Sequence, residues 1–206
     1  MNYESILAIG AHPDDVEYGC LGFLLANKNQ SNIHVYVASV GSVADPTPGR
    51  IRVEETSRAL SILTPKNLEI RHKKGIIDEN FQEILSDLEY LIEKTRPTLI
   101  LTHGPHDTHQ EHKLLYDISI SAARRKKLSM LRYSIVSNTS YFQPNYFFEF
   151  SEEILNQKMH QLSYHKTQAD KNYMTKEFLI NYHLRPYSYL HGIKYCEAYE
   201  VERIMN

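Results

Sequence analysis

Short apolar runs alternate with longer amphipathic segments along the chain. The runs predict strands near residues 5–10, 33–40, 67–71, 98–103 and 133–138, and the longer segments predict helices near 17–30, 50–63, 80–95, 109–126 and 151–166. Each helix is long enough to cross over between parallel strands, and no linker, repeat or low-complexity tract interrupts the alternation. The pattern therefore predicts one α/β sandwich with a mostly parallel central sheet.

Polar side chains gather where the first apolar run stops. Residues 6–9 form the run, and Gly-Ala-His-Pro-Asp-Asp follows at residues 10–15. Ligands of open α/β sheets bind at the carboxyl ends of strands. His12 and Asp15 carry donor atoms that a zinc-like metal takes, and Asp14 is left as a base. The alternative is a solvated Asp-Asp turn that caps the following helix.

A second polar cluster, THGPHDTHQEHK at residues 102–113, follows the apolar run 99–101. It contains four histidines and two carboxylates: His103, His106, His109, His112, Asp107 and Glu111. The spacing of His109 and His112 places both on one face of a helix that begins near residue 108. A polar, titrating loop is the alternative. Metal-type side chains at two strand ends favour a site over that alternative.

Five ordered motifs carry a family resemblance. AHPDDVEYGCLG resembles the opening motif AHPDDxExGCGG of the LmbE-like (PIG-L) family of metal-dependent N-deacetylases, and DTHQEHK is similar to its DxHxDH segment. RIRVEETSRALSIL from Arg50 resembles R-x-x-E-x-x-x-A, residues 158–168 resemble K-x-x-A-L-x-x-H-x-S-Q, and KYCEAYE resembles the closing strand. The resemblance spans residues 5 to about 200. It implies a Rossmann-like three-layer sandwich, with one deacetylase domain over residues 1–206.

The resemblance also implies roles for particular residues. His12, Asp15 and His112 match the metal ligands, and Asp14 matches the general base that activates water. Three protein ligands with one open position are typical of catalytic zinc. His109 matches the family's second histidine, which would hold the oxyanion or protonate the departing amine. None of the departures from the motifs falls on a metal ligand or on the base.

Two further assignments keep alternatives open. Arg52 matches an arginine that reaches toward substrate, whereas its spacing to Glu55 equally fits a surface pair within one helical turn. Either Asp107 or Glu111 could orient an imidazole of the metal site from behind. The choice between these two carboxylates stays open at the level of sequence.

Two more segments bear on the pocket. Residues 43–49 contain two prolines and a glycine and predict a loop after a strand end, suited to form a wall or lid. Residues 141–150 are rich in aromatic side chains, which fit a sugar-stacking platform or, more commonly, a strand packed on the core. The core strand is favoured at residues 147–150. The tyrosine-rich C-terminal part is expected to complete the sheet edge and the pocket rim.

The expected activity is zinc-dependent removal of an acetyl group from an N-acetylated amino sugar. A GlcNAc-type unit of a glycoconjugate, nucleotide sugar or pseudosaccharide would be the substrate. Two histidines and one carboxylate suit Zn²⁺ and also accept Fe²⁺, Co²⁺ or Mn²⁺. One alternative is a carbohydrate-binding protein that keeps the metal without turnover. Another is a metal-dependent phosphoesterase, which would use two metals.

Composition narrows the class of partner. A net charge of −2 and a pI near 6.6 argue against nucleic acid or an anionic membrane as partner. Cys20 and Cys196 are too few for a disulfide framework, which favours reduced thiols in the cytoplasm. No apolar segment has the length of a membrane span, and the N-terminus lacks signal-peptide features. The family resemblance is compatible with a homo-oligomer.

Overall fold

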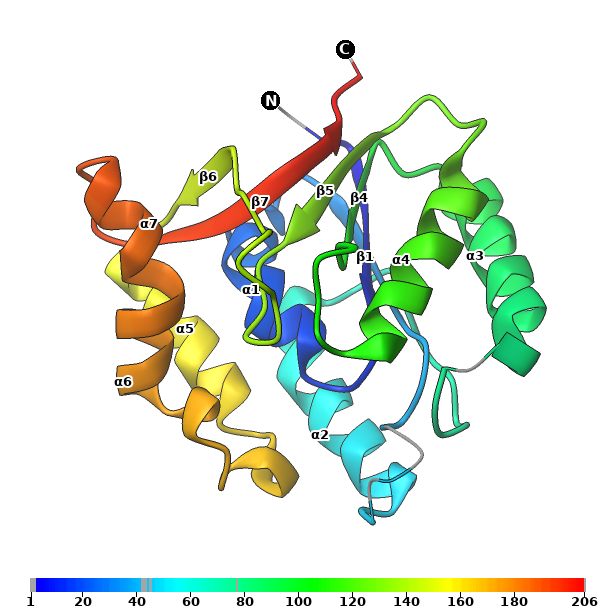
Figure 1. Ribbon diagram of the computed structural model, residues 1–206, viewed down its shortest axis with the longest axis horizontal. Coiled ribbons are helices and arrows are strands. Elements are labelled where there is room, and N and C mark those ends of the chain that lie inside the picture. Colours follow the sequence, from blue (N-terminus) through cyan, green and yellow to red (C-terminus); the bar gives the residue numbers. More distant parts are fainter. Residues whose placement is uncertain (1–2, 42–43, 45, 77, 206) are drawn as a thin grey trace.

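A single mostly parallel sheet organises the chain (Figure 1), in a computed structural model that describes residues 3–41, 44, 46–76 and 78–205. Its strands are β1 (Ser5–Gly10), β2 (Asn32–Val37), β3 (Asn67–Ile70), β4 (Leu99–Thr102), β5 (Ser129–Tyr133), β6 (Tyr146–Glu149) and β7 (Cys196–Arg203). Their order is β3-β2-β1-β4-β5-β7-β6, and β1 to β5 pair in parallel. β7 runs antiparallel to both β5 and β6. The predicted α/β class with a mostly parallel sheet is confirmed.

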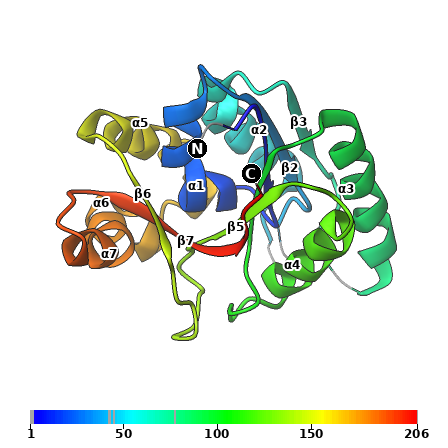
Figure 2. The ribbon, with the colours of Figure 1, turned by 90° about the horizontal axis from the view of Figure 1, so that it is seen from above.

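Helices cover both faces of this sheet. They are α1 (Asp15–Asn27), α2 (Gly49–Leu60), α3 (Phe81–Thr95), α4 (Gln110–Ala123), α5 (Glu152–Leu162), α6 (Lys176–Phe178) and α7 (Arg185–Leu190). A π-helix at Leu179–Leu184 joins α6 to α7, and 3-10 turns lie at Ser61–Leu63, Asp78–Asn80, Lys166–Gln168 and Asn172–Met174. α3 and α4 share one face with each other, and α1, α2 and α5 lie on the opposite face (Figure 2). Among the described residues, no helix is long and apolar enough to cross a membrane.

The two cores follow from the alternation of side chains along β1. Ile6 and Ala8 pack into the core under α1, whereas Leu7 and Ile9 pack into the core under α3 and α4. Successive strand residues point to opposite faces, so a strand buried on both faces must be apolar at every position. All six residues of β1 are buried. The strand is therefore fixed in register where the site loop begins.

Several boundaries differ from the predicted ones. The strand expected at 133–138 is β5 at Ser129–Tyr133, because residues 134–139 turn away from the sheet into the pocket wall. The helix predicted at 151–166 ends at Leu162, with Ser151 as its N-cap accepting a hydrogen bond from the Ile154 amide. Within the aromatic stretch 141–150, only residues 146–149 form a strand, β6, and Phe150 directly after it lies in the core.

The topology brings the two polar clusters together. β1 and β4 are parallel neighbours, so the loops that follow Gly10 and Thr102 leave the same edge of the sheet. The loop after β5 leaves this edge as well, because β5 runs parallel to β4. This is the edge at which open α/β sheets bind ligands.

Candidate active site

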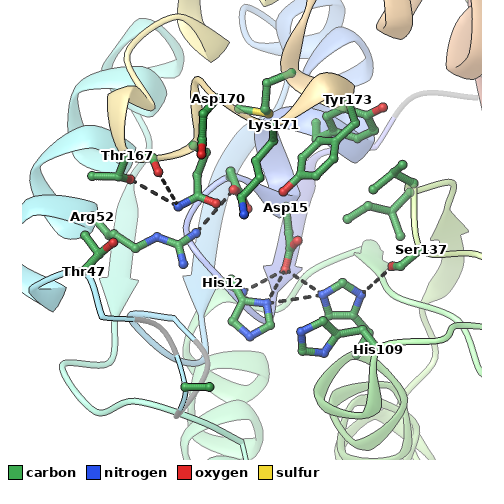
Figure 3. Close-up of a pocket in the computed structure, with 18 of the residues that line it drawn as sticks. His12, Asp15, Thr47, Arg52, His109, Ser137, Thr167, Asp170, Lys171 and Tyr173 are labelled. Atoms are coloured by element: carbon green, nitrogen blue, oxygen red, sulfur yellow. Dashed lines mark hydrogen bonds and ion pairs between the residues drawn. The ribbon is translucent and has the colours of Figure 1, made fainter.

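A cavity of about 610 Å³ opens at this edge of the sheet (Figure 3). Its lining combines the two predicted clusters with segments from the C-terminal half: His12, Asp14, Asp15, Tyr18, Ala44, Pro46, Thr47, Arg52, His109, His112, Ile135, Val136, Ser137, Thr167, Gln168, Asp170, Lys171, Tyr173 and Met174. The volume lies in the range of cavities that bind small molecules. Six of the eight site residues predicted from the sequence line the cavity, namely His12, Asp14, Asp15, Arg52, His109 and His112.

The loop after β1 is held in an uncommon conformation. Asp14 has φ 111°, in the left-handed region, where a residue other than glycine costs about 1–3 kcal/mol. Asp15 follows as the first residue of α1, and its Oδ2 accepts the amide N–H groups of Ala11 at 3.0 Å and His12 at 2.8 Å. The turn therefore separates the two carboxylates. Asp15 points back at the strand end, and Asp14 faces the cavity.

Donor atoms from the two clusters converge on one point. Nδ1 of His12 lies 3.3 Å from Nε2 of His112, and each of these nitrogens lies 3.6 Å from Oδ2 of Asp15. All three side chains are buried to at least nine-tenths. Figure 3 shows His12 and Asp15 pointing toward each other beside the helix that carries His109. This is the set of three residues that the family resemblance implies as metal ligands.

Each histidine of this set has its own carboxylate behind it. Oε2 of Glu111 lies 3.0 Å from Nε2 of His12, and Oδ2 of Asp107 lies 2.9 Å from Nδ1 of His112. Burial would raise the pKa of Glu111, but the hydrogen bond with His12 outweighs this effect and the pKa is lowered. The pKa of Asp107 is likewise lowered, because the hydrogen bond with His112 outweighs burial. Each of the two carboxylates thus contacts a different imidazole of the set.

The charges around this point suit a cation. Asp15, Asp107 and Glu111 all keep lowered pKa values despite burial, so three carboxylates are ionised close together. Against desolvation, hydrogen bonds and charge from Asp15 and Glu111 raise the pKa of His12 to about 9, which places a proton where the donor atoms meet. Imidazole nitrogen and carboxylate oxygen are zinc donors. A divalent cation bound there would replace that proton and neutralise more of the negative charge.

Two further histidines flank the set. His109 caps α4, where its Nδ1 accepts the Glu111 amide at 3.2 Å, and its ring stacks on His112 with centroids 4.4 Å apart. An imidazole that accepts through Nδ1 carries its proton on Nε2 when neutral. Burial, followed by the charges of His112 and His12, lowers the pKa of His109 and keeps it neutral. His109 can therefore donate a hydrogen bond from Nε2.

His103 contacts two members of the set, Asp15 and His112. Its Nε2 lies 3.1 Å from Oδ2 of Asp15 and 3.0 Å from the Tyr133 hydroxyl, and its ring stacks on His112 with centroids 4.0 Å apart. Burial and the nearby His112 lower the pKa of His103 to about 4. Nitrogens of His103 and His109 also lie close enough to complete two alternative triads, Asp15-His103-His112 and His12-His109-His112. Both triads share His112, so the described residues form one connected cluster.

Asp14 stands beside the set with a pKa suited to proton exchange. Burial and then the charge of Asp15 raise its pKa to about 6, while Arg52 opposes the rise. Nη2 of Arg52 lies 3.3 Å from Oδ2 of Asp14 and donates to the Pro13 carbonyl oxygen at 2.6 Å. Arg52 is buried at 5% exposure. The alternative interpretation of Arg52 as a surface residue paired with Glu55 is therefore wrong.

Glu55 has a different partner. Its carboxylate accepts hydrogen bonds from the Thr167 amide at 2.9 Å and from the Thr167 hydroxyl at 2.6 Å. This contact ties α2 to the turn at Lys166–Gln168, which brings Thr167 and Gln168 to the cavity wall. His165 is buried outside the cavity lining, with its Nε2 3.0 Å from Oε1 of Glu17. The R-x-x-E-x-x-x-A motif in α2 and the motif at residues 158–168 are therefore in contact through Glu55 and Thr167.

Other parts of the wall have no assignment at the level of sequence. The Ser137 hydroxyl lies 3.3 Å from Nδ1 of His112, and no pattern around Ser137 indicates this contact. Tyr18 lies one helical turn after Asp15, so its spacing could have placed it at the cavity. Within the predicted loop 43–49, Ala44, Pro46 and Thr47 line the cavity, while Val43 and Asp45 lie outside the described residues.

Comparisons with known proteins agree with this geometry. The family model PIG-L, described as GlcNAc-PI de-N-acetylase, matches residues 7–123. YaiS, an uncharacterized deacetylase of Escherichia coli K12, is 32% identical over 171 residues, which cover 80% of this chain and 91% of that protein. Residues 7–123 contain both polar clusters and Arg52.

Solved structures show the same fold at low identity. The N,N'-diacetylchitobiose deacetylase from Pyrococcus horikoshii superposes with a TM-score of 0.80 at 17% identity, covering 97% of this chain and 84% of that chain. GalB, the 4-carboxy-2-hydroxymuconate hydratase from Pseudomonas putida KT2440, superposes with a TM-score of 0.74 at 15% identity, covering 98% of each chain. These likenesses establish the fold, whereas the matched motifs and the curated relative establish the family: the chain belongs to the PIG-L family of N-deacetylases.

Proposed function

We propose that this enzyme hydrolyses the acetamide of an N-acetylated amino sugar, using a zinc ion held by His12, Asp15 and His112. The observation that supports it most strongly is the convergence of one carboxylate oxygen and two imidazole nitrogens within 3.6 Å of each other, beside Asp14. When bound, zinc would supply a Lewis acid for the acetyl carbonyl and lower the pKa of water. The same donors would also accept Fe²⁺, Co²⁺ or Mn²⁺.

In this proposal the proton transfers belong to Asp14 and His109. Asp14 takes a proton from the attacking water, and Arg52 holds the carboxylate in place during that step. Nε2–H of His109 donates toward the oxygen that becomes negative, or toward the amine as the C–N bond breaks. Water and amide are consumed, and acetate and a free amine are formed.

The assignment of a sugar substrate rests on the family and on the cavity wall. The family model is described by a GlcNAc-containing substrate, and the Pyrococcus horikoshii neighbour acts on N,N'-diacetylchitobiose. Hydroxyl, amide and charged groups of Thr47, Thr167, Gln168, Asp170 and Lys171 line the cavity and suit sugar hydroxyls. A GlcNAc-type unit is therefore the proposed substrate of the single domain.

A cytoplasmic location belongs to the same proposal. Cys20 and Cys196 are both free and buried, which suits a reducing compartment. The expected homo-oligomer stays a prediction.

The test is release of free amine from a panel of N-acetylated amino sugars, with the metal content of the same preparation counted by elemental analysis. Activity should disappear with a chelator and return with zinc, at one metal per chain. Asp14→Asn should keep the metal and lose about 10²–10⁴-fold in rate. Asp117→Asn makes the same chemical change at an exposed position of α4 and should leave the rate unchanged.

Three results would contradict the proposal. Near-normal rates in Asp14→Asn would show that Asp14 is not the general base. One metal per chain without turnover of any acetamido sugar would favour the carbohydrate-binding alternative. Two metals per chain would favour the phosphoesterase, which needs a second ion about 3.5–4 Å from the first.

A further inference from the structure

A second, smaller cavity adjoins the active site. We call it the annex: a cavity of about 190 Å³ lined by residues from the loop after β5, from α6, from the π-helix and from α7. Aromatic rings form much of its wall: Tyr18, Phe142, Phe178, Tyr182 and Tyr187. Figure 1 shows the loop after β5 next to the helical segment that contains α6 and α7. No site residue predicted from the sequence belongs to the annex.

The annex and the active-site cavity share a wall. Tyr18, Ile135 and Val136 line both cavities. The next residues divide between them, because Ser137 lines the active-site cavity and Asn138 lines the annex. A ligand bound beside His112 therefore lies next to the annex, at the short segment of residues 135–138 that borders both cavities.

Backbone hydrogen bonds hold this shared segment against the histidine-rich loop. The Thr108 amide donates to the Ser137 carbonyl oxygen at 2.9 Å, and the Thr139 amide donates to the His106 carbonyl oxygen at 2.9 Å. The position of the annex relative to the cluster of His12, Asp15 and His112 is thus set by the loop that leads into α4, the helix that carries His112. Such a fixed spacing is what a two-part substrate requires.

The chemistry of the annex differs from that of the active-site cavity. None of the described residues that line the annex is Asp, Glu, Lys or Arg, whereas Asp14, Asp15, Arg52, Asp170 and Lys171 all line the active-site cavity. Burial, and then the charge of Lys158, lowers the pKa of His183 to about 3, so this lining residue is neutral at neutral pH. Ser134, Asn138 and Thr139 add hydroxyl and amide groups between the aromatic rings.

One polar group between the two cavities has no partner. The Tyr18 hydroxyl is buried and has no hydrogen-bond partner among the described residues. Tyr18 packs against His183 with ring centroids 4.6 Å apart and meets Tyr173 edge-on at 6.0 Å. A buried hydroxyl normally finds a partner, so a ligand hydroxyl at this junction would satisfy it.

We infer that the annex binds an uncharged sugar ring attached to the acetamido sugar, which makes a neutral glycoside the preferred substrate class. The inference rests on the proposed function for the identity of the reacting ring. Aromatic faces pack on the C–H face of a pyranose, and neutral hydroxyl and amide groups meet its hydroxyls without the desolvation cost of a charge. A phosphate or nucleotide in the annex would meet no cation among the described lining residues.

Phe178 and Tyr182 give the inference a clean test. Their rings lie 4.9 Å apart, and Tyr182 is 70% exposed, so its truncation leaves the core intact. Tyr189 on α7 is 87% exposed and lines neither cavity, so Tyr189→Ala is the matched control. Phe178→Leu is a second variant that removes a ring and keeps an apolar side chain.

The experiment measures dissociation constants by calorimetry in an Asp14→Asn background, which prevents hydrolysis during the titration. The probes are N-acetylglucosamine, its 1-phosphate, and neutral disaccharides that join it to glucose in different linkages. At least one disaccharide should bind about three- to tenfold more tightly than the monosaccharide. Tyr182→Ala and Phe178→Leu should remove this advantage and leave monosaccharide binding unchanged, while Tyr189→Ala should preserve it.

The outcomes separate the two proposals. Equal binding of monosaccharide and disaccharides, an advantage that survives both annex variants, tightest binding of the 1-phosphate, or no binding of any probe would each overturn the annex inference. Amine release by the unmodified enzyme is scored separately. Turnover of the monosaccharide without a disaccharide advantage overturns the annex alone, and a disaccharide advantage without turnover of any probe overturns the deacetylase alone.

Discussion

Nδ1 of His12 lies 3.3 Å from Nε2 of His112, although the two residues are 100 positions apart in the sequence. The contact exists because β1 and β4 are parallel neighbours whose loops leave the same edge of the sheet. Each imidazole turns its other nitrogen to a carboxylate, so both rings are oriented before any ligand arrives.

This convergence predicts that a divalent metal stabilises the folded state. Zinc at a free concentration 100-fold above its dissociation constant should add about 2.7 kcal/mol to the free energy of unfolding. His112→Ala should lose this gain, because it removes one of the three donors. Thermal unfolding with zinc and with a chelator measures both effects. His106→Ala removes an exposed histidine of the loop before α4 and should respond to zinc like the unmodified protein; an equal response of His112→Ala would argue against the site.

The carboxylates that contact the two metal-site histidines predict a partial loss of metal affinity when either is replaced. Glu111→Gln and Asp107→Asn remove the charge behind His12 and His112 respectively, and each should weaken zinc binding by about 10–100-fold. Competition with a chromogenic chelator gives the affinities. If only one of the two variants weakens binding, the other carboxylate serves the fold and not the metal.

The clusters could be predicted from the sequence because their geometry is local to two strand ends. His12, Asp14 and Asp15 sit in a turn directly after a buried strand, and periodicity alone places that turn at the binding edge. The contact between Asp14 and Arg52 was beyond such reasoning, since it depends on how α2 packs across the loop. The motif match predicts that Arg52 reaches toward substrate, whereas its contact with Asp14 follows only from the fold.

The C-terminal part shows the same limit more strongly. β7 lies between β5 and β6, and its Glu197 ties it to α1 and α5 by accepting the amides of Gly22 and Phe23 at 2.7 and 2.8 Å and pairing with Lys158. These contacts join residues far apart in sequence, and an antiparallel strand has no signature that gives its neighbours. Most of the annex is built from this C-terminal part, so nothing in the sequence marks its tyrosines and phenylalanines as residues of a cavity.

The position of Arg52 predicts a specific kinetic effect. Because Nη2 of Arg52 holds both the Pro13 carbonyl oxygen and the Asp14 carboxylate, Arg52→Lys should misplace the base and lower kcat by about 10–100-fold. KM for the acetamido sugar should change much less. Steady-state kinetics on the best substrate of the panel separates the two parameters. Arg58→Lys, at an exposed position of the same helix, is the control. A rise in KM with kcat unchanged would instead assign Arg52 to substrate binding.

Buried His183 predicts a loss of stability in mild acid. Burial lowers its pKa from 6.5 to about 3 in the folded chain, so between these values the unfolded chain binds a proton that the folded chain does not. The free energy of unfolding therefore falls as the pH drops below 6.5, and this residue alone accounts for about 2 kcal/mol between pH 7 and pH 5. His183→Phe keeps a ring beside Tyr18 and removes the titrating group. Urea unfolding at both pH values should show a drop that is smaller in His183→Phe by about that amount. Equal drops in the two proteins would mean that His183 accepts a proton within the folded chain, and that the annex beside it is more open to water than its burial indicates.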